Sequence, residues 1–155
     1  MELELSECTQ KHIDLIYNMA NDIETTKNSF NRSAIKYDEH CKWYKDSLNN
    51  PNRYMYVVKD KDIIVGYIRL DIDKKKGEIS YSIEKSFRGK GYANELLNII
   101  KSKAEEIGLE VLAGKVKPEN IFSRKTFIYN NFIEYKEEGY FKYVFFLKGD
   151  KNEDN

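Results

Sequence analysis

Residues 82–93 read Ser82-Ile83-Glu84-Lys85-Ser86-Phe87-Arg88-Gly89-Lys90-Gly91-Tyr92-Ala93, and this stretch decides the fold. An alternating apolar strand runs through a short basic turn into a periodic helix. A helix N-terminus leaves its first N–H groups unpaired and carries the positive end of the helix dipole. Gly89 and Gly91 let the backbone approach a ligand, and Arg88 and Lys90 add positive charge. The stretch predicts a pyrophosphate cradle, the alternative being a glycine-rich turn with solvated basic side chains.

Two better-known phosphate loops are excluded. The chain has no run of Gly, four residues and then Gly-Lys-Ser/Thr, and the dinucleotide fingerprint fails because position 94 is Asn. The run Arg88-Gly-Lys-Gly91-Tyr-Ala93 instead fits Arg/Gln-x-x-Gly-x-Gly/Ala. It resembles the acetyl-CoA loop of the GNAT superfamily of acyl-CoA N-acyltransferases.

A second motif about thirty residues downstream supports the resemblance. GNAT domains typically carry an Asn, a small residue three later, an aromatic seven later and Gly-Phe eleven and twelve later. Asn120, Ser123, Phe127 and Phe132 have that spacing, with Asn131 in place of Gly. Asn tolerates the left-handed conformation that closes a helix better than any residue except Gly.

The resemblance implies an α+β GNAT fold with a mixed, mostly antiparallel central sheet of about six to seven strands and helices on both faces. Periodicity and turn signals agree with it. We expect one domain over residues 1–148 and a polar tail over 149–155. The predicted strands cover 2–6, 54–58, 63–70, 78–83, 109–116 and 140–147, and the predicted helices begin after Thr9, cover 38–48 and run from 92 to a stop at Gly108.

Composition excludes several classes of protein. Lys+Arg and Asp+Glu are 26 each, so no overall field favours nucleic acid or an anionic membrane. No apolar run is long enough to span a membrane, and the first residues lack a signal-peptide pattern. Cys8 and Cys41 have no metal-ligand spacing, and no metal is expected. We expect a cytoplasmic protein whose oligomeric state is open, a homodimer being one option.

The resemblance also implies where acetyl-CoA, the acyl donor, is held. Its pantetheine arm would lie between the fourth and fifth strands, against backbone groups of Tyr81 and Ile83, with the Tyr81 N–H as the oxyanion donor. Asn120 would contact the arm or cap a helix. The pyrophosphate would lie on the N–H groups of the loop residues Arg88, Gly89, Lys90, Gly91, Tyr92 and Ala93.

The catalytic acid and base are less clear. Phe127 stands where the family commonly has a Tyr that protonates the departing thiolate, and a phenyl ring donates no proton. Tyr129 is a substitute only if the helix has already ended, because it lies about 200° further around it. Glu78 is near the position of the family's catalytic carboxylate. Its side chain lies on the opposite face of the strand from those of Tyr81 and Ile83 unless a bulge intervenes. The alternative is an ordinary charge at a strand end.

The N-terminal half loosely resembles GNAT members that acetylate UDP-linked 4-amino-sugars in the biosynthesis of surface glycans such as pseudaminic acid. Arg32 and Arg69 would grip nucleotide phosphates, and Trp43 would stack on a uracil or sugar face. His40 is a further substrate contact suited to neutral pH. The alternatives are core packing for the rings and solvation for the arginines.

Three functions remain open at this stage. The first is acetyl transfer from acetyl-CoA to a small-molecule primary amine, such as a nucleotide-linked amino-sugar. The second is acetylation of a protein or a polyamine. The third is a CoA-binding module without catalysis, suggested by Phe127.

Overall fold

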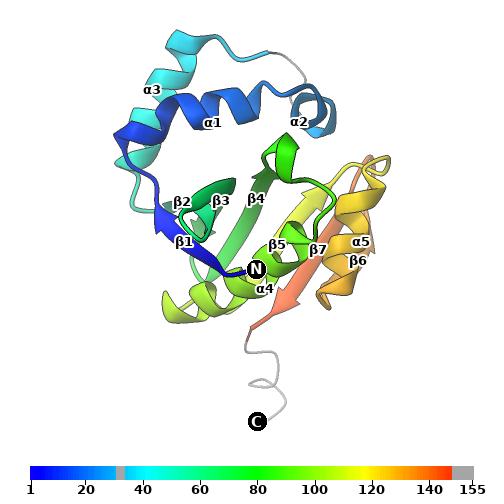
Figure 1. The fold of residues 1–155 in the computed structure, drawn as a ribbon. Helices are drawn as coiled ribbons and strands as arrows, with labels where there is room; N and C mark the ends of the chain where they lie inside the picture. Colours follow the sequence, from blue (N-terminus) through cyan, green and yellow to red (C-terminus); the bar gives the residue numbers. More distant parts are fainter. Residues whose placement is uncertain (31–33, 148–155) are drawn as a thin grey trace.

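The structure is a computed structural model that describes residues 1–30 and 34–147, built around a seven-stranded sheet of order β1-β2-β3-β4-β5-β7-β6 (Figure 1). The strands are β1 (Leu3–Glu7), β2 (Arg53–Asp60), β3 (Ile63–Asp73), β4 (Lys76–Ile83), β5 (Val111–Val116), β6 (Ile133–Lys136) and β7 (Phe141–Phe146). The α-helices are α1 (Ile13–Ala20), α2 (Ile23–Asn28), α3 (Tyr37–Leu48), α4 (Tyr92–Glu106) and α5 (Ile121–Tyr129), and two 3-10 turns cover Gln10–His12 and Lys85–Phe87.

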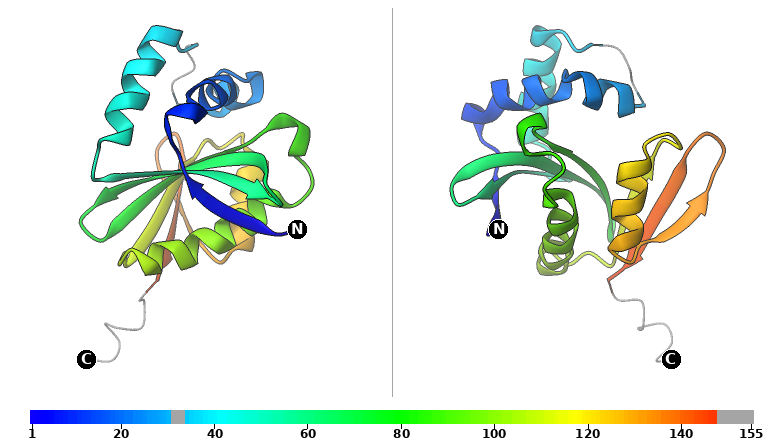
Figure 2. Two further views of the ribbon diagram at one scale, coloured as in Figure 1. Left: turned by 60° about the vertical axis from the view of Figure 1, so that its left-hand side comes forward. Right: turned by 45° about the vertical axis from the view of Figure 1, so that its right-hand side comes forward.

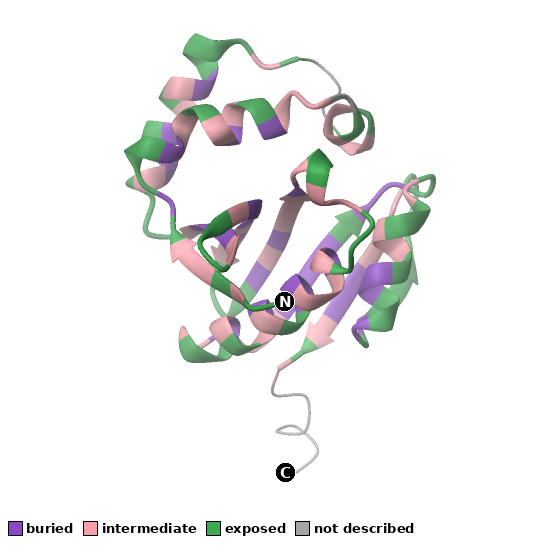
Figure 3. Ribbon diagram, viewed as in Figure 1, coloured by how far each residue is buried: buried purple, intermediate pink, exposed green. Residues whose placement is uncertain are grey.

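Helices cover both faces of the sheet, as the sequence predicts (Figure 2). On one face α4 and α5 bury a core that includes Leu96, Leu97 and Ile100. On the other face α1 and α3 pack over a smaller core around Tyr44 and Val57. The middle residues of β2 and β3 are buried on both sides, whereas β4 is fully buried only at positions that face α4 and α5, and the outer helix surfaces are exposed (Figure 3). The α+β class and the mixed sheet are therefore confirmed.

The sheet is split between its two central strands. All neighbouring pairs are antiparallel except β4 and β5, which are parallel because α4 carries the chain from one to the other. These two strands pair only at Lys76↔Val111, Gly77↔Leu112 and Glu78↔Ala113. Beyond Glu78 and Ala113 they separate, so residues 79–83 of β4 have no partner on β5. The open end of this gap lies beside the start of α4.

The register of β4 determines which way the backbone groups of each residue point. Its pairing with β3 is continuous from Lys76 to Ile83, so β4 has no bulge on that side. The Glu84 N–H donates to the Val65 carbonyl at 2.8 Å, which makes Ile83 opposite Gly66 a pair without mutual hydrogen bonds. By alternation, the backbone N–H and C=O of Tyr81 and Ile83 point away from β3, toward the gap.

Two elements were absent from the sequence prediction. The sequence of α2 has no helical apolar stripe, and the Asp22 side chain begins it by accepting the Thr25 N–H at 3.3 Å. The short strand β6 is exposed along its whole length and forms a hairpin with β7. Arg32 and the expected tail over 149–155 lie outside the described residues.

Candidate active site

The glycine loop has the backbone that the sequence predicts. Gly89 and Gly91 have φ of 78° and 89°, in the left-handed region that favours glycine. Gly91 is the N-cap residue of α4, so the first N–H groups of α4 begin directly after it. Around Gly91, a built Cβ would meet only the Met1 Cε, at 4.0 Å. The loop is open on its outer side, where an anion can approach.

Three other side chains of this loop have structural contacts. The Tyr92 hydroxyl donates to Asp60 Oδ2 at 2.6 Å, which ties the start of α4 to the end of β2. The Lys90 ammonium lies 5.8 Å from the centre of the Phe87 ring. Ala93 is buried in the core beneath α4. The side chains of Tyr92 and Ala93 are thus engaged within the fold, and the role of the loop in holding a pyrophosphate stays a prediction.

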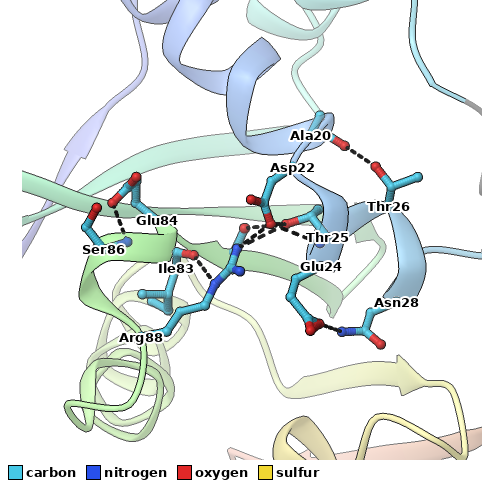
Figure 4. Close-up of polar contacts among 11 residues, drawn as sticks. Ala20, Asp22, Glu24, Thr25, Thr26, Asn28, Ile83, Glu84, Ser86 and Arg88 are labelled. Carbon is cyan, nitrogen blue, oxygen red and sulfur yellow. Dashed lines mark hydrogen bonds and ion pairs between the residues drawn. The ribbon is translucent and has the colours of Figure 1, made fainter.

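Arg88 points from the loop to α2 (Figure 4). Its Nε donates to the Ile83 carbonyl oxygen at 2.9 Å, and its Nη2 donates to Asp22 Oδ2 at 2.8 Å. Burial alone would raise the pKa of the Asp22 carboxyl, but hydrogen bonds from Arg88 and the Thr25 N–H hold it below its usual value. The side chain of Arg88 thus connects α2 to the end of β4.

Tyr81 places its ring on the α4 and α5 side of the gap. Its hydroxyl lies 2.9 Å from the Ser123 hydroxyl near the start of α5, and burial raises its pKa. Asn120 caps α5, because its Oδ1 accepts the Ser123 N–H at 3.2 Å. Asn120 therefore acts as a helix cap in this structure. The two residues flank the gap from its two sides.

Phe127 belongs to a packed aromatic wall. Its ring is 2% exposed, stacks on Tyr143 at 5.0 Å and has its tip against Gly114 of β5. A Cβ built on Gly114 would stand only 2.6 Å from the Phe127 Cζ. Tyr129 does not join this group, since it is 74% exposed at the end of α5. The structure thus brings Tyr81, but not Tyr129, to the gap.

Glu78 lies on the other face of the sheet. Because β4 has no bulge, Glu78, Ser80 and Ser82 face α1 and α3, whereas Tyr81 and Ile83 face α4 and α5. Glu78 lines a recess of about 200 Å³ at the point where β4 and β5 begin to separate. The recess is also lined by Lys76, Ala113, Gly114, Lys115, Tyr140 and Lys142.

The expected substrate contacts His40, Trp43 and Arg69 all have partners within the fold. His40 is buried between α1 and α3, with its Nε2 2.9 Å from the Ile13 carbonyl oxygen. Arg69 donates to Asp71 at 3.1 Å and to Ser80 at 3.4 Å, and its guanidinium lies 5.5 Å from the Trp43 ring centre. His40 is thus remote from the recess, whereas Arg69 is on the same face of the sheet as Glu78.

The segment around α2 bridges the open end of the split sheet. On the β4 side, the Thr25 hydroxyl lies 3.3 Å from the Ser82 hydroxyl. On the β5 side, the Lys117 ammonium donates to the Lys27 carbonyl at 3.2 Å. These contacts place α2 across the gap, on the face that Glu78 occupies.

Within residues 1–30 and 34–147, no group of three or more His, Cys, Asp and Glu side chains could hold a metal ion. None of the helices in this part of the chain is long and apolar enough to cross a membrane.

Comparison with known proteins defines the class. Residues 2–132 match the model of the acetyltransferase (GNAT) domain, so the chain belongs to this family. A curated relative, the uncharacterized N-acetyltransferase p20 of Bacillus licheniformis, is 29% identical over 92 residues. That match covers 57% of this chain and 50% of the relative, so it spans half the length of the relative.

Solved structures share the fold over nearly the whole chain. A spermidine N-acetyltransferase of Vibrio cholerae, in complex with CoA and spermine, has a TM-score of 0.86 and 19% identity, covering 94% of this chain and 95% of that one. The putative acetyltransferase yncA of Salmonella typhimurium, with its cofactor acetyl-CoA, has a TM-score of 0.76 and 15% identity, covering 94% of each chain. At these identities the likeness shows the fold alone.

No sequence motif marks the lysines of the recess, Lys76, Lys115 and Lys142. They occupy ordinary strand positions, where a charge normally indicates solvent exposure. Lys115 and Lys142 lie on one face of the sheet because the pairing of β5 with β7 places them opposite each other, and the sequence alone does not give this pairing. The alternation of Ala113 and Lys115 along β5 was the available signal.

Proposed function

We propose that the protein is an acetyl-CoA-dependent N-acetyltransferase of small primary amines, acting by direct transfer in a ternary complex. The observation that carries the proposal is the gap between β4 and β5, with Tyr81 on one face and Glu78 on the other. The thioester donor would enter along the α4 and α5 face, and the amine would approach from the α1 and α3 face. Because Tyr81 and Glu78 lie on opposite faces of β4, the donor and the amine would meet at the gap from opposite sides.

The residues at the gap fit the acyl donor. Acetyl-CoA supplies an activated acetyl group, and the backbone groups of Tyr81 and the Ile83 N–H would offer its pantetheine arm a strand edge, while the Ile83 carbonyl is held by Arg88. The Tyr81 N–H would stabilise negative charge on the thioester oxygen. The N–H groups after Gly91 would hold the pyrophosphate.

Glu78 has the role of accepting the proton of the attacking amine, directly or through a water. The amine nitrogen forms a bond to the carbonyl carbon as the carbon–sulfur bond breaks. The proton from the amine goes to Glu78, and the departing thiolate takes a proton from solvent. The packed position of Phe127 gives no donor for that last step.

The acceptor is proposed at the level of a small amine. A nucleotide-linked amino-sugar, suggested by the N-terminal sequence, fits Arg69 and Trp43 on the acceptor face. A polyamine is the second candidate, because the fold is shared with the spermidine N-acetyltransferase of Vibrio cholerae. A protein acceptor and a CoA-binding module without catalysis are the remaining alternatives.

The test is thiol release from acetyl-CoA in the presence of different amines. We expect Glu78→Gln to lower kcat at neutral pH by about 10² while acetyl-CoA binding is retained. Glu105→Gln, an exposed exchange on α4, is the matched control. Calorimetric binding of acetyl-CoA without thiol release on any amine would establish the non-catalytic alternative instead.

A further inference from the structure

The recess beside Glu78 has an unusual charge. Three of its lining side chains are lysines, and one is a carboxylate, so it holds an excess of positive charge although the whole chain is neutral. None of five ion pairs in the described residues involves a side chain of the recess, and these pairs are Arg53–Asp71, Arg69–Asp71, Arg88–Asp22, Lys103–Glu106 and Arg124–Glu134.

Two of the lysines repel each other. Lys115 of β5 and Lys142 of β7 are directly opposite in the antiparallel register, so their side chains lie on one face of the sheet. Like charges in this position destabilise a sheet. Lys76 and Glu78, two residues apart on β4, line the same recess. An anion between the lysines would relieve the repulsion.

An aromatic ring completes the recess. The Lys115 ammonium lies 5.6 Å from the centre of the Tyr140 ring, and the Phe30 ring meets Tyr140 edge-on at 6.2 Å. Phe30 follows α2, so the segment that bridges the gap also borders the recess. A small molecule held here would contact cations, one carboxylate and an aromatic face together.

We propose that this recess selects acceptor amines that carry an anionic group, a phosphate or a carboxylate, over polyamines. The proposal rests on the proposed function, because it assigns the amine to Glu78 and the anion to Lys115 and Lys142. Charge-assisted hydrogen bonds from lysine stabilise the anion. A polyamine brings only positive charges and meets three ammonium groups.

The experiment uses amines matched in pairs, with acetyl-CoA in excess. Glucosamine 6-phosphate against glucosamine tests a phosphate, and serine against serinamide tests a carboxylate, with spermidine as the polycation. We expect kcat/KM, calculated on the concentration of unprotonated amine, to be about tenfold or more higher for the anionic member of one pair than for its partner. The pair that shows the preference identifies the anion. Equal values in both pairs, or spermidine as the best acceptor, would overturn the proposal.

Variants locate the preference. We expect Lys142→Gln, which removes the charge, to lower the anionic-to-neutral ratio of kcat/KM severalfold, and Lys142→Arg to restore most of it. Lys45→Gln, an exposed lysine on α3, is the matched control and should leave the ratio unchanged. A ratio that is the same in Lys142→Gln and the unaltered protein would show that the anion lies elsewhere.

A binding measurement separates this inference from the proposed function. Glucosamine 6-phosphate, glucosamine, serine and serinamide are titrated calorimetrically into the protein with bound CoA. Tighter binding of an anionic member, weakened by Lys142→Gln, supports the recess even if no thiol is released. Turnover without any anionic preference contradicts the recess and leaves the acetyltransferase function standing.

Discussion

Arg88 and Asp22, 66 positions apart in sequence, form an ion pair of 2.8 Å between the loop that precedes α4 and the N-cap of α2. The arginine of the glycine loop is thus turned to α2, on the face of the sheet that Glu78 occupies. Through the same guanidinium it holds the Ile83 carbonyl at the end of β4. The side chain of Arg88 thus connects the loop before α4, the end of β4 and the start of α2.

We expect this pair to make stability depend on pH. The pKa of Asp22 is lowered in the folded state, so its contribution is present above the unfolded value of about 3.8 and is lost as pH falls through the folded pKa. Asp22→Asn should therefore reduce the decline of the unfolding free energy between about pH 5 and 3. Urea unfolding at each pH measures it. A decline identical to that of the unaltered protein would contradict the role of the pair.

Gly91 and Gly108 provide a matched test of the donor loop. Their φ values are 89° and 90°, and neither has room-limiting neighbours, so glutamate at either position meets similar backbone strain. We expect Gly91→Glu to abolish acetyl-CoA binding by placing a negative charge before α4, whereas Gly108→Glu retains it. Calorimetry with acetyl-CoA distinguishes them. Retained binding in Gly91→Glu would remove the loop from the donor site.

Phe127→Tyr should not restore an acid. The tip of the ring is against Gly114, so a hydroxyl would be pressed on β5 inside a wall that is 2% exposed. We expect a loss of about 1–3 kcal/mol in unfolding free energy and no gain in kcat. Denaturant unfolding and steady-state kinetics report the two quantities. A variant that is equally stable and faster would show that position 127 does face the thiolate.

Tyr81→Phe separates the backbone of Tyr81 from its phenol. The proposed oxyanion donor is the N–H, which the substitution leaves in place. We therefore expect kcat to change less than about threefold, with a stability loss near 1 kcal/mol for the hydrogen bond to Ser123. A fall in kcat of about 10² would instead assign a proton transfer to the phenol, because general acid catalysis has that magnitude.

The sequence was sufficient for elements with strong local signals. The positive φ of Gly91 and Asn131 and the buried face of α4 follow from glycine, asparagine and an apolar period. It failed for α2, which depends on the Asp22 cap and on contacts with β4 and β5. The alternation along the strand predicts that Glu78 faces away from Tyr81 and Ile83 unless a bulge intervenes, and the continuous pairing of β4 with β3 shows no bulge.

Site residues were predictable only where the role belongs to the backbone. The position of Tyr81 at the gap follows from the strand order, which a family resemblance supplies, and the role of its N–H stays a prediction. The lysine pair at 115 and 142 depends on register between strands that are distant in sequence. His40 has a side chain that can titrate near neutral pH, yet it is buried by the packing of α1 against α3. No local pattern in the sequence carries that information.

The pleat of β4 separates substitutions that affect one face of the sheet from substitutions that affect the other. Residues with odd numbers face α4 and α5, and residues with even numbers face α1 and α3. A point mutation at 78, 80 or 82 therefore alters one surface and leaves the side chains of the other in place. Under the proposed function, substitutions on the even-numbered face would change which amine is bound and leave the acetyl-CoA face in place, whereas a single-residue insertion in β4 would disturb both faces.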